Sequence, residues 1–501
     1  MSRPSPISDR LTESTMSETQ QFQVAADCPQ CGGGIEFEEE ASVIRCNYCG
    51  SALLLGNRQG VVRYTVEPRI RVEDLNRLVT RVIYKQTGRS ITRLLEQRSL
   101  KAPFWRIRGN VFRWILGRRK TSGSEAALGA TAQYEKDLKA RWLDFTFPAY
   151  QKPDVGLYSL GVRASVIQLR YFSPSSRDHE AEFIKVDVPV KQALLRGLRA
   201  MRAGLASSKV KQPEMERIEL IGERASLIYF PLWVVSCAYP RGSATLIIDA
   251  LGGDVLKAWW DGVEKVQVHS GAWLDKAAGL GPVQFLPFRC PECGWDLPFH
   301  PYNTIHVCRN CHRAWNENHG RLVEVDYFAV DPPKAAKHKW AFLPFWTFRG
   351  VIVHRNHRVE NMAQLLRLTV PPRVVDFQAE AQNPIRFFIP AFKSRGLSHL
   401  NRMAHILVLR TPSRSYIPRH RLEEKNLMGV YLPQEEARQM ARIVVFSLIP
   451  AGNRQARQVL GRGKLELYEP CLEWFPFAVS KHNYTEALSG FALARNSVEV
   501  S

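Results

Sequence analysis

The sequence predicts a mainly β, α+β protein that is internally duplicated. Each half is expected to be a small four-cysteine zinc ribbon followed by a larger β-rich domain with one or two helices. Three observations support this prediction. A four-cysteine pattern occurs twice with the same spacing, and proline–aromatic motifs recur in the same order after each occurrence. In addition, 501 residues with 45% hydrophobic content are enough for sizeable cores in about two to four domains.

The eight patterned cysteines form two sets: Cys28, Cys31, Cys46 and Cys49, and Cys290, Cys293, Cys308 and Cys311. In each set, fourteen residues separate two C-x2-C pairs, and glycine follows the first pair. Structural zinc prefers a closed tetrahedron of soft ligands, and a C-x2-C turn places two sulfurs on one ion. The sequence therefore predicts two structural Zn²⁺ ions, one in each ribbon.

Disulfide bonds and redox chemistry are the alternatives for these cysteines. Residues 1–22 are polar, are expected to be disordered and do not resemble a secretory leader; Met16 is an alternative start. A reducing, cytoplasmic location is therefore expected, where thiols stay available for metal. The two remaining cysteines, Cys237 and Cys471, lie in apolar surroundings and are expected to be buried core thiols.

Proline–aromatic motifs extend the repeat beyond the cysteines. Pro103, Pro148 and Pro231 begin or end motifs that recur 241 to 245 positions later, at Pro344, Pro390 and Pro476. The tryptophans of these motifs, Trp105, Trp233 and Trp346, are expected in the core. The alternative is an exposed aromatic surface flanked by Arg108, Arg349 and Arg395, which would suit stacked bases or a lipid interface.

The repeat divides the chain into five parts. They are a disordered N-terminus at 1–22, zinc ribbon 1 at 26–55, copy 1 of the β-rich domain at 60–262, zinc ribbon 2 at 288–325 and copy 2 at 326–501. Within copy 1, we expect a helix near 72–98, a strand at 102–116, paired strands at 158–172 and a helix from Pro189 to about 206. A strand-rich stretch at 216–239 and a hairpin at 244–261 follow. In copy 2, a helix after Pro433 should match the helix after Pro189.

The formal net charge of +21 favours polyanionic partners, either nucleic acid or anionic lipid head groups. Basic residues cluster at Arg106, Arg108, Arg113, Arg118, Arg119 and Lys120, at Arg196, Arg199 and Arg202, and at Lys334, Lys337 and Lys339. The alternative is a generally basic, well-solvated surface. The longest apolar stretch, at 225–239, is too short to span a membrane.

Catalytic motifs are absent from the sequence. The fragment nearest to a phosphate-binding loop ends at Lys464, but Leu465 replaces the required Ser or Thr. His312 is expected to be solvated or to support the metal site from outside. Asp178, His179 and Glu180 carry acid–base side chains without identifiable partners. The chain is therefore predicted not to be an enzyme and to bind no nucleotide cofactor; an active site in the β-rich domains is the less favoured alternative.

The two ribbons, together with Pro103-Phe104-Trp105 and Pro344-Phe345-Trp346, resemble a loose group of bacterial tandem zinc-ribbon proteins that are often labelled primosomal-helicase-like. Their ribbons are similar to that of a general transcription initiation factor. The resemblance implies action alongside membrane-associated stress or scaffold proteins rather than catalysis. This chain departs from the group in having no transmembrane segment.

These features favour a non-enzymatic adaptor or scaffold. Its expected partner is another protein, with peripheral contact to an anionic membrane as a further expectation. The alternative is a sequence-nonspecific nucleic-acid-binding protein, whose affinity should fall steeply with salt because phosphate contacts release counterions.

Overall fold

The computed structural model describes residues 22–58, 60–119, 134–161, 167–172, 181–204, 210–261, 283–333, 338–370, 377–394, 397–410, 414–421, 426–450 and 452–498. Several predictions therefore lie outside the described residues: the disorder of residues 1–21, the Asp178–Glu180 cluster, and the basic residues Lys120, Lys334, Lys337 and Arg395. Phe22 was placed in the disordered N-terminus, but it is buried.

Each cysteine set lies in turns that are flanked by short strands. Ribbon 1 contains β1 (Gln23–Asp27), β2 (Gly34–Glu38), β3 (Val43–Arg45) and β4 (Ala52–Gly56). Ribbon 2 contains β13 (Gln284–Pro287), β14 (Ile305–Val307), β15 (Ala314–Asn318) and β16 (Arg321–Val325).

In its described part, copy 1 has two helices and contributes eight strands to a ten-stranded sheet. Its elements are β5 (Val61–Val66), α1 (Val72–Thr87), β6 (Arg93–Arg119), β7 (Tyr134–Pro148), β8 (Gln168–Tyr171), β9 (Glu182–Phe183), α3 (Val190–Gly204), β10 (Val210–Tyr239), β11 (Gly242–Asp249) and β12 (Val255–Trp260). The sheet runs β12-β11-β10-β5-β8-β1-β2, so the first two strands of ribbon 1 extend it; β6 pairs with β10, β7 and β9.

Copy 2 is an eight-stranded sheet with four helices in its described part. Its elements are β17 (Tyr327–Val330), β18 (Trp340–His354), β19 (His357–Val359), α4 (Met362–Thr369), β20 (Arg386–Pro390), α5 (Leu397–Arg410), β21 (Tyr416–Ile417), α6 (Gln434–Leu448), α7 (Arg454–Arg462), β22 (Lys464–Val479), β23 (Asn483–Glu486) and β24 (Ala492–Ala494). Three 3-10 turns lie at Ala379–Gln382, Arg419–Arg421 and Arg495–Ser497. The mainly β, α+β class is confirmed, with two more helices in this copy than expected.

The two copies share strand register. Phe104 pairs with Pro148 in copy 1, and Phe345 pairs with Pro390 in copy 2. The β-strand pairs β6–β10 and β18–β22 repeat the correspondence, because Lys101 faces Pro231 and Phe342 faces Pro476. Residues that match in the sequence therefore occupy the same places in both sheets, as a duplication requires.

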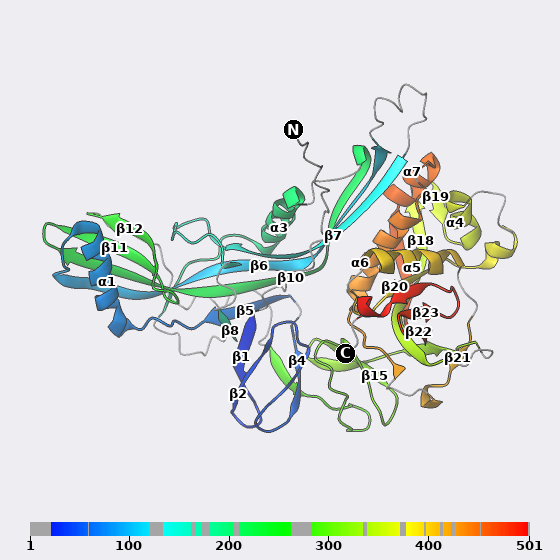
Figure 1. Cartoon of the computed structure of the whole chain (residues 1–501), viewed down its shortest axis with the longest axis horizontal. Helices are drawn as coiled ribbons and strands as arrows, with labels where there is room; N and C mark the ends of the chain where they lie inside the picture. The colour runs from blue at the N-terminus through cyan, green and yellow to red at the C-terminus, as the bar shows by residue number, and fades with distance from the viewer. Residues whose placement is uncertain are drawn as a thin grey trace, which may run out of the picture.

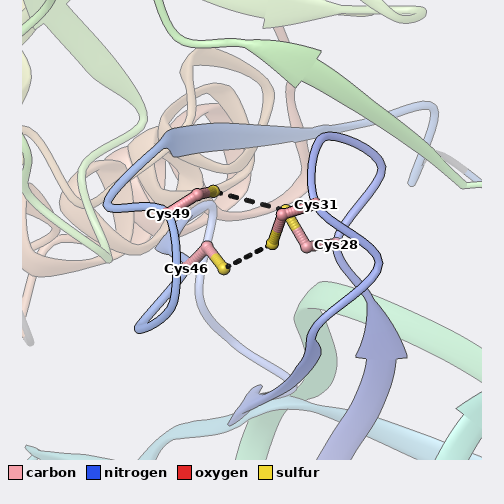
Figure 2. A group of neighbouring side chains, drawn as sticks. All are labelled: Cys28, Cys31, Cys46 and Cys49. Carbon is pink, nitrogen blue, oxygen red and sulfur yellow. Dashed lines mark hydrogen bonds between the residues drawn. The ribbon is translucent and has the colours of Figure 1, made fainter.

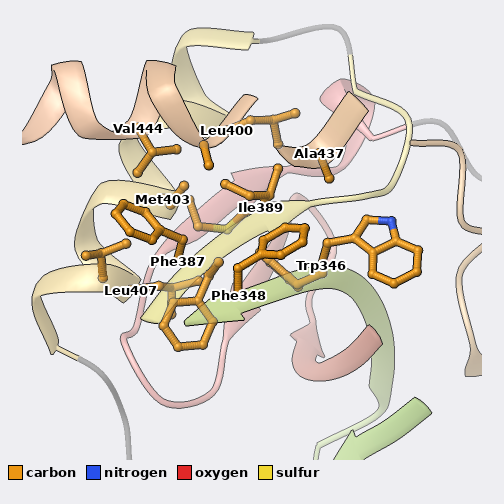
Figure 3. Close-up of a cluster of buried hydrophobic side chains, with 14 of the residues drawn as sticks. Trp346, Phe348, Phe387, Ile389, Leu400, Met403, Leu407, Ala437 and Val444 are labelled. Carbon is orange, nitrogen blue, oxygen red and sulfur yellow. The ribbon is translucent and has the colours of Figure 1, made fainter. Parts of the chain in front are cut away.

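The motif tryptophans anchor the same helix in each copy. Trp105 Nε1 donates to the Val188 carbonyl and Trp346 Nε1 donates to the Leu432 carbonyl, both at 2.8 Å. Each carbonyl directly precedes the proline at the start of α3 or α6. Trp105 and Trp346 are buried, which confirms their predicted core role, whereas Trp233 is only partly buried. In copy 2, Phe387 and Ile389 of β20 point toward Met403 of α5 and Val444 of α6 (Figure 3).

The two copies also share a turn that the sequence did not lead us to predict. The turn after β11 begins at Asp249, whose buried carboxylate accepts the backbone N–H groups of Leu251 and Gly252. After β23, the buried Glu486 accepts those of Leu488 and Ser489 in the same way. In the sequence, each acidic residue is followed by Ala-Leu, but a match of three residues is too short to indicate a repeat by itself.

Two boundaries differ from expectation. The helix predicted to reach residue 98 ends at Thr87, because Gly88 takes a left-handed conformation (φ 68°) and its N–H bonds the Tyr84 carbonyl. The long strand β6 begins shortly afterwards, at Arg93. Of the paired strands expected at 158–172, the described residues contain only β8. The hairpin at 244–261 and the helix after Pro433 are confirmed.

The paired strands β6 and β10 run through most of the molecule (Figure 1). The lobe of α1, β11 and β12 lies at one end, and α3 and the ribbons lie on opposite sides of the middle (Figure 1). At the other end the strands reach copy 2, where the Trp114 ring stacks on Phe446 of α6 with centroids 5.3 Å apart. We call this end, residues 110–119, 134–142 and 210–224, the arm of copy 1.

Candidate metal centres

The same turn holds all four cysteine pairs. In ribbon 1, the N–H of Gly32 bonds the Cys28 carbonyl at 2.8 Å, and the N–H of Gly50 bonds the Cys46 carbonyl at 3.0 Å. In ribbon 2, Gly294 and His312 make the matching bonds to Cys290 and Cys308. All four residues that follow the pairs have positive φ, between 57° and 73°. This left-handed residue turns the chain so that both sulfurs of a pair face the same point.

These turns bring each set of four sulfurs together (Figure 2). Cys28 Sγ lies 3.8 Å from Cys49 Sγ, and Cys31 Sγ lies 3.7 Å from Cys46 Sγ. Within each set, all four sulfurs lie within 4.8 Å of one another.

Ribbon 2 repeats the arrangement. Cys290 pairs with Cys311, and Cys293 pairs with Cys308, both at 3.5 Å between sulfurs. A tetrahedral ion with Zn–S bonds of about 2.3 Å separates its sulfurs by about 3.8 Å. Each four-cysteine group could therefore hold one metal ion with little rearrangement.

The thiols at each site are poised to ionise unequally. The Ser51 hydroxyl and backbone lower the pKa of Cys49 to about 6. In ribbon 2, the Asn310 side chain and the Trp295 backbone lower the pKa of Cys293 to about 6. Burial instead raises the pKa of Cys311 to about 12. Four neighbouring thiolates repel one another, so a cation is needed for all four to ionise together.

The two ribbons form one body, which we call the double ribbon. Strand β13, which leads into ribbon 2, pairs with β4 of ribbon 1, from Gln284 opposite Gly56 to Pro287 opposite Leu53. A common apolar core contains Val43, Leu54, Phe288, Cys290, Leu297, Cys308 and Trp315. The Pro301 carbonyl also accepts the backbone N–H of Ser42 at 2.6 Å. Two of the metal-site cysteines are thus part of the core that joins the ribbons.

Buried ion pairs attach the double ribbon to the sheet of copy 1. Glu39, at the end of β2, is 2% exposed and contacts the guanidinium groups of both Arg106 and Arg108. Arg106 also bonds Asp144 of β7 through Nε at 2.8 Å and Nη2 at 2.5 Å. Burial raises the pKa of Glu39, but the charges of Arg108, Arg106 and Arg58 outweigh it and hold the pKa below its usual value.

These ion pairs show that part of the predicted basic surface is buried. Arg106 and Arg108 were candidates for an exposed polyanion site, but both are buried and paired with carboxylates. Arg113 and Arg118 likewise pair with Glu216 and Glu214. Paired arginines are needed here because a carboxylate such as Glu39 is costly to bury alone.

The unpatterned cysteines lie apart from the metal centres. Cys237 is fully buried, and Cys471 is partly buried. Burial raises the pKa of both thiols, to about 12 for Cys471. For Cys237 the expected core position is confirmed; Cys471 is less buried than expected.

His312 takes the turn position that glycine occupies in the other three cysteine pairs. Its φ is 57°, and its carbonyl accepts the Tyr327 hydroxyl at 2.7 Å. A non-glycine residue pays roughly 1 kcal/mol for this conformation. We expect His312→Gly to bind the same amount of metal and to be as stable as the wild type or up to about 1 kcal/mol more stable.

Metal content and thermal unfolding of the His312→Gly protein check this prediction. His312→Ala serves as the control, because it removes the imidazole and keeps the Cβ. Loss of metal in both variants would show that the imidazole is a ligand and that our reading of this position is wrong.

No protein-family model, curated protein or solved structure matches this chain. None of the helices in the described part of the chain has the length and apolar content needed to cross a bilayer.

Proposed function

We propose that the protein is a non-enzymatic zinc-binding scaffold in which two Zn²⁺ ions hold the double ribbon in shape. The sulfur geometry is the observation that carries this proposal: two sets of four cysteines, each within 4.8 Å, at the spacing of a zinc tetrathiolate. Four thiolates fill the coordination shell and leave no position for water or substrate. The metal would therefore stabilise the fold rather than perform chemistry.

The scaffold role rests on how the double ribbon is attached. It is joined to copy 1 through β1 and the Glu39 ion pairs, and to copy 2 through the bond from Thr304 N–H to the Val430 carbonyl at 2.7 Å. A junction of this kind would position two large β-rich domains relative to each other. We infer that partner proteins, and peripherally an anionic membrane, bind surfaces of these domains in the cytoplasm.

Metal analysis of purified, tag-free protein tests the zinc assignment. We expect two zinc ions per chain, one for each four-cysteine group. Replacement with Co²⁺ should give the intense visible bands of a tetrahedral sulfur site. Far less than two equivalents of metal, or a cobalt spectrum typical of oxygen ligands, would contradict the proposal.

Nucleic-acid binding is the second candidate, and the net charge of +21 is the observation that favours it. Binding of duplex DNA and of RNA at about 50 and 200 mM salt separates the two functions, because phosphate contacts weaken steeply with salt. The scaffold proposal expects no salt-sensitive binding of either nucleic acid, and tight binding at the lower salt would favour the alternative.

A further inference from the structure

The duplication lets the outer face of one helix be compared with the same face of its counterpart. Helices α3 and α6 correspond, because each follows the carbonyl that accepts the motif tryptophan. Ala193 of α3 and Ala437 of α6 are both fully buried, and their N–H groups bond the carbonyls of Pro189 and Pro433. The inward faces of the two helices are thus equivalent.

The outward face of α6 is covered by the arm of copy 1. Glu436 approaches Arg224 at 3.4 Å, and the Gln439 side chain accepts the Gly222 N–H at 3.3 Å. One turn further on, Arg442 lies 3.6 Å from Glu219.

In the described part of the chain, the matching face of α3 has no covering strands of this kind. Leu195 corresponds to Gln439 and is 53% exposed. The helix contains no acidic residue but has Lys191, Arg196, Arg199 and Arg202. Among the described residues, no carboxylate forms an ion pair with Lys191, Arg196 or Arg199. The Arg196 guanidinium instead lies over the Phe147 ring, 5.9 Å from its centroid.

Strand β7 extends this surface beside the helix. Gly197 brings α3 so close to the sheet that a Cβ there would lie 3.5 Å from Leu143 of β7. Arg141, Leu143 and Phe145 are two positions apart along the strand, so their side chains project from the same face of the sheet. Both are exposed, Phe145 by 36%. The described acidic residues that precede α3 most closely in the sequence already have partners: Glu182 forms an ion pair with Arg98, and Asp187 accepts the Gln151 N–H.

The charges indicate what this surface binds. If the arm of a second molecule covered α3 as the arm covers α6, its Arg224 would approach Lys191 and Gln192. The corresponding residues of α6 are Glu435 and Glu436, so repulsion between like charges would replace an attraction. An anionic occupant is favoured instead. Exposed Leu195 and Phe145 would gain little from a nucleic-acid backbone, whereas the boundary of a bilayer accepts apolar side chains beneath basic ones.

We propose that α3 and the adjacent part of β7 form a docking surface for an anionic lipid bilayer, through Lys191, Arg196 and Arg199 together with Leu195 and Phe145. The helix lies on the side of the long strands opposite the ribbons, so the double ribbon remains accessible when this surface is occupied (Figure 1). The proposal gives the membrane contact of the scaffold role a location, but it does not depend on the metal.

Co-sedimentation with vesicles tests this proposal. The probes are vesicles of phosphatidylcholine with phosphatidylglycerol, and vesicles of phosphatidylcholine alone. We expect the full-length protein to bind only the anionic vesicles. Arg199→Gln should weaken binding about fivefold, because one basic residue near an anionic surface contributes about that factor. Leu195→Gln should weaken it further by a similar factor, independently of salt.

Arg454→Gln is the matched control, since Arg454 is exposed on α7 and also lacks an ion-pair partner in the described part of the chain. It should bind vesicles as the wild type does. Three results would overturn the proposal: no binding of the wild type to anionic vesicles, equal losses for Arg199→Gln and Arg454→Gln, or no effect of Leu195→Gln.

Binding of duplex DNA by the same variants is measured in parallel, to test nucleic acid as the alternative polyanion. If Arg199→Gln lowers DNA binding but leaves vesicle binding unchanged, the surface binds nucleic acid and the lipid proposal is wrong. Zinc content is measured on the same samples, so loss of the metal centres is recognised separately from loss of membrane binding. The melting temperature shows that each exposed-site variant is folded.

Discussion

Cys308→Ser is expected to lose the metal of ribbon 2 and to destabilise ribbon 1 as well. A structural Zn²⁺ site contributes about 10–16 kcal/mol to folding, which is comparable to the whole stability of a domain, about 5–15 kcal/mol. Cys308 is fully buried in the core that the two ribbons share. Ribbon 2 without metal would release β13 from β4, exposing Leu53, Leu54 and Leu55 of ribbon 1.

Metal analysis and amide hydrogen exchange measure the two effects. We expect the bound zinc to fall from two equivalents to one or fewer, and the β4 amides to exchange faster. Cys471→Ser is the matched control, because that thiol is partly buried but lies outside both sulfur clusters. Unchanged exchange in β4 of a Cys308→Ser protein that has lost one zinc would show that the ribbons fold independently.

Arg106→Met is expected to destabilise the protein by about 3 kcal/mol or more, because it leaves Glu39 buried with one fewer counter-charge. Arg108 and Arg58 remain near Glu39, which keeps the expected loss at the lower end of the range for buried pairs. Adding Glu39→Gln should restore part of the stability. Arg289→Met is the control; it breaks the exposed pair with Asp296 and should cost less than about 1 kcal/mol.

The effect of Arg106→Met should depend on pH. In the wild type the pKa of Glu39 is held below its usual value, so its ion pairs stabilise the fold above the carboxyl range and are lost as the pH falls through that pKa. Removing Arg106 raises the pKa. The stability difference between wild type and variant should therefore be largest near neutral pH and shrink as Glu39 is protonated. Chemical denaturation across this range measures it, and a constant difference would contradict this role for Glu39.

Local patterns predicted the two four-cysteine clusters because the geometry that forms them is largely local. Each C-x2-C pair is a four-residue turn, and only the meeting of two pairs requires longer-range folding. The sequence repeat matched Pro148 with Pro390, and the structure places the two prolines at equivalent positions of the two sheets. The end of α1 depends on Gly88, a signal that was present, but the apolar spacing continued beyond it and extended the predicted helix too far.

Other features depend on contacts between distant segments. The residues near Arg106 in the sequence do not indicate that it is buried, because its partner Glu39 lies in ribbon 1, 67 residues away. The pairing of β13 with β4 is similar, as it joins residues separated by more than two hundred positions. The difference at the outward face of α3 became visible only once α6 and its covering strands could be compared with it.

The stacking of Trp114 on Phe446 has a consequence for how such a chain arose. The strand that carries Trp114 belongs to the first repeat, and the helix on which it packs belongs to the second. A single-repeat ancestor that carried both surfaces could have buried them only by associating with another molecule. Gene fusion would then have converted an association between subunits into an internal one, independent of concentration, and freed one of two once-identical helices to acquire a different partner.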